Sequence, residues 1–501
     1  MNKINNKKEF ILNYIASSNK FILSSELIDE LIKKFPNTSK ENARKIISNL
    51  KKNNEIISSE PITFSNNSYA YALKNKKVNY KNLEHLIKNH KKKLFRAICL
   101  IKREKGVITY NELAKITAGV TAKFGNNLEI EQIIKELSYF NIGIQREYKG
   151  ITFIVNNKSS NYDLDQKILQ LEKENKTIIY MLNWLKDINI INIDDQFTFK
   201  GKGNNFKGIE NGNLIWDAFF FTNTSGISNL SDSDKKTIGV VDFSYKTEYD
   251  WLDVEGLKDR VNIFINSTKN QKRKVFPIIF ADKITNAAKK LIKENNYMCV
   301  DIKKILGNNY ERIISQYIEI ENKEKIDIDE VDKICNLIGS NANYGNMKGN
   351  LFEYMMGEVF RKIYNEIGNN INHSIIIDGK EIDYRIETIN ENIYIELKAY
   401  KKETEIKLGD REQKSTVNWA YQVVFEAFKR NFKNDKSRKC KFCYITTAKF
   451  EDKALEKLED LNAGKFRAEK LECYYDRERL LNLLKKYDCK KEIKIIKNYF
   501  W

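Results

Sequence analysis

Residues 378–400, DGKEIDYRIETINENIYIELKAY, decide how the C-terminal part of this chain is expected to fold. The segment EIDYRIET alternates apolar and polar residues, INEN supplies a polar turn, and IYIELKAY resumes with β-branched and aromatic residues. Alternation with a period of two is typical of strands. The stretch therefore predicts a β-hairpin.

Three charged side chains of this hairpin are expected to meet. Residues two apart on a strand share a face, so Glu396 and Lys398 point the same way, and Asp383 on the neighbouring strand can approach them. Carboxylates of this kind bind Mg²⁺, and a lysine beside them can orient or help deprotonate an attacking water. The pattern indicates hydrolysis of phosphodiester bonds. The alternative is an exposed hairpin whose Glu and Lys form an ordinary surface pair.

The order Asp383, then Glu396-Leu397-Lys398, resembles the PD-(D/E)XK nuclease superfamily, although Ile382 stands where the family has proline. The resemblance covers about residues 345–490. It includes a helix before the hairpin, GNLFEYMMGEVFRKIY, and a helix after it, NWAYQVVFEAFKR.

The resemblance implies roles for five side chains of this sequence. Glu353 would join Asp383 and Glu396 in holding Mg²⁺, or Mn²⁺ in its place, with the Leu397 carbonyl as a further ligand. Lys398 would act on the water, and Gln422 would steady the lysine or the phosphate. A nuclease domain is expected over residues 349–501.

Length and composition limit the class of protein. At 501 residues the chain is too long for one core, and three to four domains are expected. Its hydrophobic content of 42% is sufficient for those cores. The sequence has no run of about 18 apolar residues and no signal peptide, so we expect a cytoplasmic protein without a membrane span.

The positive charge gathers near the N-terminus. The formal net charge is +19, and residues 1–160 carry 29 Lys and Arg against 14 Asp and Glu. This excess favours a polyanionic partner, double-stranded DNA. A Lys-rich composition inherited from an AT-rich coding sequence is the competing explanation.

Residues 1–78 have the outline of a winged helix, with three amphipathic helices followed by a hairpin. The third helix, KENARKIISNLKKNN, would lie in the major groove. Winged helices that mediate only protein contacts are the alternative. The residues available to phosphates or base edges are Lys40, Arg44, Lys45, Lys51 and Lys52.

The same pattern recurs at residues 81–157, which predicts a second winged helix. Its third helix is acidic, so we expect this copy to dock on the first winged helix or on a neighbouring domain. The basic residues of its first helix would then be the DNA-facing set: Lys91, Lys92, Lys93, Arg96, Lys102 and Arg103. A connecting helix is expected over residues 158–189.

The middle region, residues 190–320, has strands and helices in the same order as the C-terminal core. Asp217 has the place of the first carboxylate, and Asp242-Phe243-Ser244 replaces the second carboxylate, spacer and lysine, with Lys246 two residues further along. Three interpretations stay open: a degenerate copy of the nuclease fold, an unrelated α/β domain, or a second working site. Residues 321–348 are expected to be a linker made of a short acidic helix and a Gly- and Asn-rich loop.

The expected fold class is therefore multidomain α+β and α/β, with two winged helices, an α/β middle domain and a PD-(D/E)XK core. We expect a Mg²⁺-dependent DNA endonuclease, most simply one that restricts foreign DNA and dimerises to cut both strands. The alternatives are a nicking nuclease of transposition or repair, a single-strand or RNA nuclease, and a non-catalytic DNA-binding regulator or scaffold.

Overall fold

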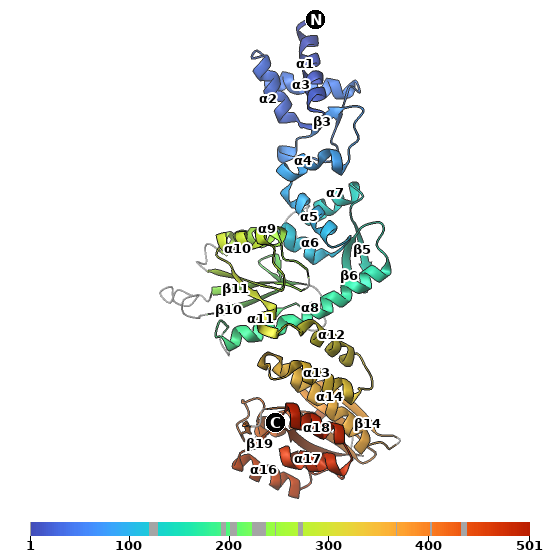
Figure 1. The fold of residues 1–501 in the computed structure, drawn as a ribbon, viewed down its shortest axis with the longest axis vertical. Helices are drawn as coiled ribbons and strands as arrows, with labels where there is room; N and C mark the ends of the chain where they lie inside the picture. The colour runs from blue at the N-terminus through green and yellow to red at the C-terminus, as the bar shows by residue number, and fades with distance from the viewer. Residues whose placement is uncertain are drawn as a thin grey trace. The chain divides into compact units, whose positions relative to one another are not determined.

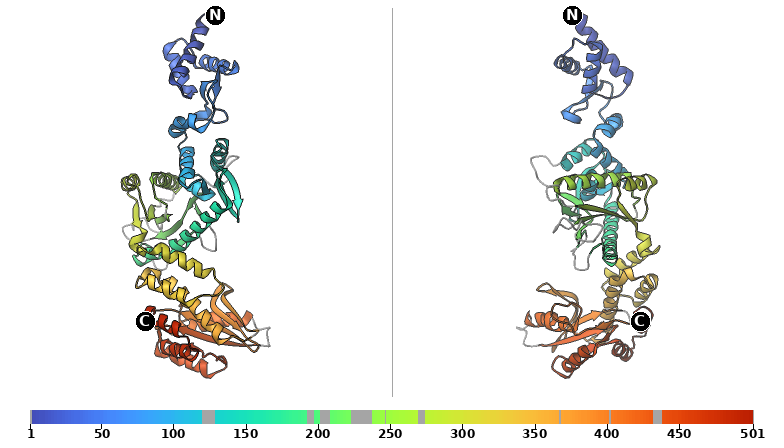
Figure 2. Two further views of the ribbon diagram at one scale, coloured as in Figure 1. Left: turned by 45° about the vertical axis from the view of Figure 1, so that its right-hand side comes forward. Right: turned by 90° about the vertical axis from the view of Figure 1, so that its left-hand side faces the viewer.

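The chain divides into two compact units, Met1–Ile302 and Lys303–Trp501 (Figures 1 and 2). Both are seen in a computed structural model. It describes residues 2–119, 129–191, 197–200, 208–222, 237–245, 247–268, 274–366, 368–400, 403–431 and 438–500. Lys246, which was expected near Asp242, lies outside these residues.

The N-terminal helices and hairpin form as expected for a winged helix. Ala43, Ile46, Ile47 and Leu50 line the buried side of the third helix, and the Ser39 hydroxyl caps its start by accepting from Asn42 N. Periodic burial of this kind stabilises a helix through one apolar stripe. The three strands form a sheet in the order β1-β3-β2. The elements are α1 (Asn2–Ser18), β1 (Ile22–Leu23), α2 (Ser24–Lys34), α3 (Lys40–Lys52), β2 (Ile56–Ser58) and β3 (Ala70–Leu73).

Residues 81–157, expected to form a second winged helix, have the same order of helices and strands as residues 1–78, with one more helix than expected. Helix α4, capped by Asn79, precedes the others, and the sheet of this repeat has the order β4-β6-β5. The long helix α8 (Asn161–Asp187) follows where a connecting helix was predicted. The elements of the repeat are α4 (Tyr80–His90), α5 (Lys92–Arg103), β4 (Val107–Thr109), α6 (Tyr110–Thr117), α7 (Glu129–Tyr139), β5 (Ile144–Tyr148) and β6 (Ile151–Val155).

The rest of the first unit is a five-stranded mixed sheet in the order β7-β10-β11-β12-β13. Helices α9 and α10 cover one face, where Ile279 and Ala281 of β12 are buried. Helix α8 covers the other face, where Trp184 meets Phe280. The elements are β7 (Phe197–Phe199), β8 (Ile209–Asn211), β9 (Leu214–Trp216), β10 (Ala218–Thr222), β11 (Thr237–Ser244), α9 (Trp251–Thr268), β12 (Val275–Ala281), α10 (Asn286–Glu294) and β13 (Met298–Asp301). Helix α11 (Ile302–Leu306) begins at the last residue of this unit.

The second unit begins earlier than expected, because the interval 321–348 is folded. Helix α13 (Ile328–Ile338) packs against α12 (Tyr310–Glu321), α14 (Gly345–Ile363) and α18 (Lys490–Tyr499), and Tyr344 is fully buried with its hydroxyl on the Leu306 carbonyl. The expected acidic helix is therefore α13, but this interval is not a linker. The Gly- and Asn-rich run expected to be a loop forms a short 3-10 helix, Ala342–Tyr344, and the start of α14, because its Tyr344 and Met347 are buried in the core.

The sheet of the second unit has the order β14-β15-β16-β18-β20. The predicted hairpin is β15 and β16, and an antiparallel edge strand, β14, precedes it through a turn at Asp378 and Gly379, both with positive φ. The elements are α12 (Tyr310–Glu321), α14 (Gly345–Ile363), β14 (Asn370–Ile377), β15 (Lys380–Glu387), β16 (Glu391–Lys398), β17 (Glu405–Ile406), the π-helix η4 (Trp419–Phe425), α15 (Glu426–Asn431), β18 (Lys439–Thr446), β19 (Lys449–Phe450), α16 (Asp452–Ala463), β20 (Tyr474–Tyr475), α17 (Arg477–Lys486) and α18 (Lys490–Tyr499).

The two five-stranded sheets have the same topology. In each, the first three strands along the chain are antiparallel neighbours, and the fourth and fifth add in parallel. A helix precedes the first strand, and helices connect the third to the fourth and the fourth to the fifth strand. The sequence order α-β-β-β-α-β-α-β is thus present twice.

Candidate functional site

Two acidic side chains of the β15–β16 hairpin lie side by side. Tyr384 pairs with Ile395, and this register continued by one residue places Asp383 opposite Glu396. The Leu397 amide donates to Asp383 Oδ2 at 2.6 Å, which fixes that carboxylate against β16. Only 9% of Asp383 and 6% of Glu396 is exposed. The hairpin therefore holds two buried carboxylates next to each other.

Lys398 joins them from the end of β16. Its Nζ lies 2.7 Å from Glu396 Oε1, 3.4 Å from Asp383 Oδ2 and 2.9 Å from the Leu397 carbonyl oxygen. Three oxygens from three residues thus converge on one cationic group. The predicted meeting of Asp383, Glu396 and Lys398 is present in the structure, and their chemical roles stay predictions.

The charges of this cluster do not balance. Burial and the neighbouring Glu396 raise the pKa of Asp383 to about 8, and burial also raises the pKa of Glu396. Burial alone would lower the pKa of Lys398, but attraction to Glu396 and Asp383 raises it overall. Glu396 Oε2 is buried and accepts no hydrogen bond from the described residues. The cluster therefore has an unused ligand atom and too little positive charge.

Glu353, on α14, is near but not within this cluster. Its negative charge contributes to the raised pKa of Asp383, while its own Oε2 lies 3.4 Å from His373 Nε2. Among the described residues no three His, Cys, Asp or Glu side chains gather closely enough to hold a metal ion. The structure thus assembles two of the three predicted carboxylate ligands.

Gln422, which was expected to steady Lys398 or the phosphate, forms hydrogen bonds with other side chains. Its side-chain oxygen accepts from Arg411 Nε at 2.8 Å, and its amide nitrogen donates to Asn418 Oδ1 at 2.9 Å. Gln422 lies in the π-helix η4, whose extra residue per turn changes which side chains face the sheet. The structure does not bring Gln422 to Lys398, and its expected role there has no contact to support it.

The predicted DNA-binding side chains lie on the outer side of α3. Lys40, Arg44, Lys45 and Lys52 are exposed, opposite the buried stripe. Lys51 is half-buried, and its Nζ lies 2.6 Å from Glu60 Oε2. The helix thus presents four basic side chains to solvent and one in an ion pair.

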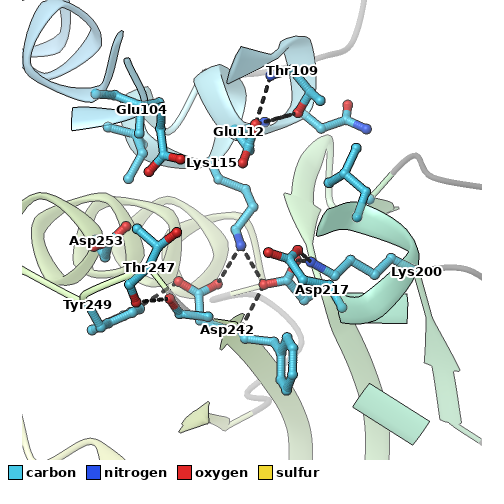
Figure 3. A pocket seen from close by; sticks show the side chains of 18 of the residues that line it. Glu104, Thr109, Glu112, Lys115, Lys200, Asp217, Asp242, Thr247, Tyr249 and Asp253 are labelled. Carbon is cyan, nitrogen blue, oxygen red and sulfur yellow. Dashed lines mark hydrogen bonds and ion pairs between the residues drawn. The ribbon is translucent and has the colours of Figure 1, made fainter. Parts of the chain in front are cut away.

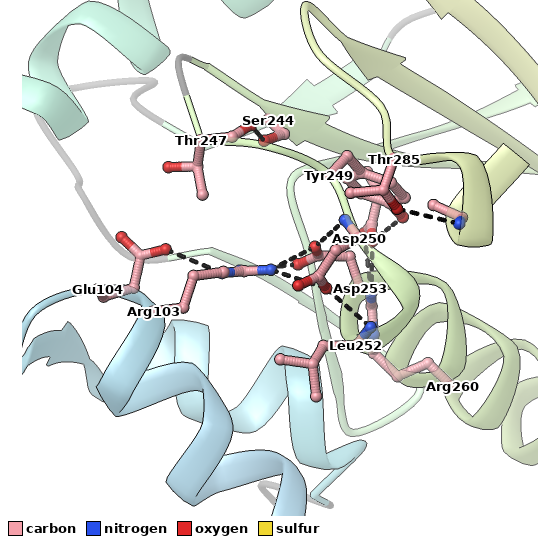
Figure 4. Close-up of polar contacts among 12 residues, drawn as sticks. Arg103, Glu104, Ser244, Thr247, Tyr249, Asp250, Leu252, Asp253, Arg260 and Thr285 are labelled. Carbon is pink, nitrogen blue, oxygen red and sulfur yellow. Dashed lines mark hydrogen bonds and ion pairs between the residues drawn. The ribbon is translucent and has the colours of Figure 1, made fainter.

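Arg96 and Arg103 of α5 pair with acids within the first unit, whereas DNA binding by the other basic residues of this predicted set stays a prediction. Arg103 Nη1 lies 2.6 Å from Asp253 Oδ2 and 3.0 Å from Asp250 Oδ1 (Figure 4). Arg96 is nearly buried and pairs with Asp259 at 2.5 Å. Lys91, just before this helix, pairs with Glu136, while within the helix Lys93 pairs with Glu129 and Lys102 lies over the Tyr80 ring. The expected docking of this repeat on a neighbouring domain is present, because these acidic partners of the arginines lie on or just before α9.

A second buried carboxylate pair lies in the middle sheet. Asp217 and Asp242 are 1% and 2% exposed and face three cationic side chains: Lys115, Lys200 and Arg260 (Figure 3). The sequence identified the two acids but not the bases, which come from α6, from the residue after β7 and from α9. A signal was present, since Arg260 interrupts the apolar positions of α9, but its partner cannot be inferred without the fold.

Comparisons with known proteins give distant structural likenesses. No family model and no curated protein sequence matches the chain. Three solved structures match: an EndoMS–dsDNA2 complex, a repair endonuclease from Pyrococcus abyssi and the restriction endonuclease FokI. Their identities are 15%, 12% and 12%, and their TM-scores are 0.16, 0.18 and 0.18.

The matches are partial on both sides. They cover 30%, 32% and 55% of this chain, and 52%, 60% and 59% of those structures. The chain therefore has a distant similarity to DNA endonucleases over little more than half of their length. Because the scores are low, only the strand order and side-chain geometry of this chain bear on its function. No helix among the described residues is long and apolar enough to span a bilayer.

Proposed function

We propose that this protein is a metal-dependent endonuclease that hydrolyses phosphodiester bonds of duplex DNA with Asp383, Glu396 and Lys398. The observation that supports it is the charge imbalance at the β15–β16 hairpin. Two buried carboxylates share one ammonium group, and one Glu396 oxygen has no partner among the described residues. Buried carboxylates in such a state are costly unless a cation compensates them.

The residues present fit a hard divalent cation. Asp383, Glu396 and the Leu397 carbonyl would hold Mg²⁺ or Mn²⁺, and Glu353 would have to leave His373 to join them. Oxygen ligands of this type, few in number and completed by water and phosphate, are the usual set for Mg²⁺. When bound, Mg²⁺ polarises the phosphate and lowers the pKa of the attacking water.

Lys398 would give up its place on the carboxylates and act on the substrate. Its four-carbon side chain leaves from the end of β16, so the ammonium can remain beside the hairpin after release. There it can orient the water by a hydrogen bond and offset the charge that develops on the phosphate. Asp383 keeps its position throughout, because the Leu397 amide holds it.

The first winged helix would place the enzyme on DNA. Four exposed basic side chains on α3, and the excess positive charge of residues 1–160, favour a duplex partner. One chain supplies one hairpin site of this kind, so cutting both strands calls for a homodimer or two successive nicks. Restriction of foreign DNA is the role that we favour.

A plasmid-nicking assay tests the proposal. The full chain should nick supercoiled DNA with millimolar Mg²⁺ or Mn²⁺ and not with EDTA. Asp383→Asn, Glu396→Gln and Lys398→Met should each lower the rate by about 10²–10⁴-fold. Asp488→Asn and Lys490→Met are matched controls, because they break an ion pair whose side chains are 79% and 86% exposed, and both should keep the wild-type rate.

Two outcomes would contradict the proposal. Equal nicking by all variants would mean that a contaminant cuts the DNA. DNA binding without cleavage of any substrate would favour the non-catalytic regulator or scaffold.

A further inference from the structure

The middle sheet holds its two acids at the positions that the acids of the C-terminal core occupy. Ala218 pairs with Val241, so Asp217 lies opposite Asp242, as Asp383 lies opposite Glu396. The Phe243 amide donates to Asp217 Oδ2 at 2.7 Å, which reproduces the bond from the Leu397 amide to Asp383 Oδ2. Strand order, register and this hydrogen bond all agree between the two sheets.

The lysine position differs. Ser244 stands where the C-terminal core has Lys398, and its hydroxyl donates to the Thr247 carbonyl. The cationic groups come from elsewhere in the chain. Arg260 Nη2 contacts both oxygens of Asp242, at 2.9 and 2.7 Å, and Tyr249 donates to Asp242 Oδ2.

Asp217 is compensated by two lysines. Lys200 Nζ lies 3.0 Å from Asp217 Oδ1 and 2.7 Å from Glu174 Oε2. Lys115 Nζ contacts Asp217 Oδ2 directly and lies 3.8 Å from Asp242 Oδ1 (Figure 3). Every oxygen of Asp217 and Asp242 thus has a partner.

The two sheets differ in the number of cationic side chains that face their carboxylates. In the middle sheet, Asp217 and Asp242 face three bases, Lys115, Lys200 and Arg260, and Lys200 is shared with Glu174. In the C-terminal core, Asp383 and Glu396 share Lys398 alone. A divalent cation entering the middle site would have to displace several buried charge-assisted hydrogen bonds, which is costly.

Lys115 belongs to α6 of the second winged helix. The Arg260 Nε donates to the Lys115 carbonyl at 3.1 Å, so both the backbone and the side chain of Lys115 are held. A side chain at Gly256 of α9 would place its Cβ 2.9 Å from that carbonyl oxygen, so the two helices approach too closely for any residue but glycine. The carboxylate pair therefore binds α6, the helix that packs against α9, through Lys115.

We infer that the middle domain is a second copy of the C-terminal core in which Lys115, Lys200 and Arg260 take the place of a metal ion, so that its carboxylates fasten the second winged helix instead of cutting DNA. This inference holds whether or not the C-terminal site is active. It assigns the Asp217–Asp242 pair a binding function whose ligand is a lysine of the same chain.

Thermal unfolding of the full chain tests whether the contact between Asp217 and Lys115 stabilises the fold. Asp217→Asn removes a charge whose two oxygens both have cationic partners and should lower the melting temperature by about 5–10 °C. Lys115→Met should lower it by a similar or smaller amount, because Lys200 remains on Asp217. Lys290→Met is the control, since Lys290 is 79% exposed beside Glu294. An unchanged melting temperature in both Asp217→Asn and Lys115→Met would overturn the inference.

A metal-dependence experiment gives a second readout that does not require the Asp217 variant to fold. The chain carrying Asp383→Asn and Lys398→Met keeps the middle domain intact and should show no Mg²⁺- or Mn²⁺-dependent nicking. Nicking that survives in this chain and disappears when Asp242→Asn is added would overturn the inference. Absence of nicking from the unmodified chain would count against the proposed function alone, because the melting experiment would still decide the inference.

Discussion

Asp217 and Asp383 occupy the same place in two sheets of the same topology, yet their surroundings differ in one respect, the number of cations. Asp217 contacts two ammonium groups and an amide, whereas Asp383 contacts one amide and shares one ammonium with Glu396. Buried ion pairs stabilise a fold only when charges and hydrogen bonds are matched. The two aspartates should therefore respond in opposite ways to neutralisation.

Asp383→Asn should raise the melting temperature of the second unit in EDTA by about 3–6 °C. The asparagine keeps an oxygen for the Leu397 amide and removes one of two buried like charges beside Glu396. Differential scanning calorimetry of the full chain measures this. A fall instead of a rise would mean that Asp383 is a structural partner of Lys398 and not an uncompensated ligand.

Gly357 is the glycine at which a small change should disturb the site. A Cβ there would lie 2.3 Å from the Tyr384 hydroxyl, and Tyr384 follows Asp383 directly. Gly357→Ala should lower the nicking rate about tenfold or more and destabilise the fold, because the buried ring has little room to move.

Gly349→Ala is the matched control on the same helix, where nothing lies within 4 Å of a Cβ. It should keep the activity and stabilise α14 by up to ~1 kcal/mol through helix propensity. Equal effects of the two substitutions would show that the Tyr384 contact is unimportant.

At the scale of elements, α3 and α5 are similar basic helices whose basic faces have different surroundings. Both have apolar stripes and basic faces, but α3 points its face to solvent while α5 directs Arg96 and Arg103 at acids of the middle domain. A helix sequence gives the direction of its polar face and not what that face meets. Of the two helices, α3 has more exposed basic side chains.

Arg44→Ala and Lys45→Ala should each weaken DNA binding and reduce its salt dependence. Losing one phosphate contact lowers the slope of log K against log salt by about 0.9. Fluorescence anisotropy at several salt concentrations measures this, with Lys290→Ala on α10 as the control. Slopes that equal the wild-type value would place the DNA on another surface.

At the scale of the whole molecule, the pH dependence of stability should report the buried cluster of the first unit. Burial by itself would raise the pKa of Asp217, but Lys115 and Lys200 hold it well below its usual value. A depressed folded-state pKa gives stability that is complete above the unfolded-state value of about 4 and is lost as the pH falls below it.

The melting-temperature difference between the wild type and Asp217→Asn should therefore stay constant from about pH 8 to pH 5 and shrink below about pH 4. Melting curves of both proteins across this range test it. A difference that grows on acidification would reverse the sign and contradict the lowered pKa.

Much of the local structure could be predicted from the sequence. Period-two alternation gave the β15–β16 hairpin, and helical periodicity gave α3, because these patterns depend on near neighbours. Strand β14 was missed although it pairs with β15 through a local turn, because it is an edge strand with irregular burial. The packing of the Gly- and Asn-rich run was missed because Tyr344 is held by Leu306, 38 residues away. Gln422 contacts Arg411 and Asn418, and its expected role at the lysine or the phosphate stays a prediction.

The sequence by itself determined which carboxylates could work together, since Asp383 and Glu396, like Asp217 and Asp242, are brought opposite one another by strand pairing. Only the tertiary structure decided what compensates them. Lys115 and Arg260 are 102 and 18 residues away from the acids that they contact, and no periodicity encodes such contacts. Among the described residues, Asp383 and Glu396 thereby share one ammonium group, while Asp217 and Asp242 each have a cationic partner, one of which comes from α6.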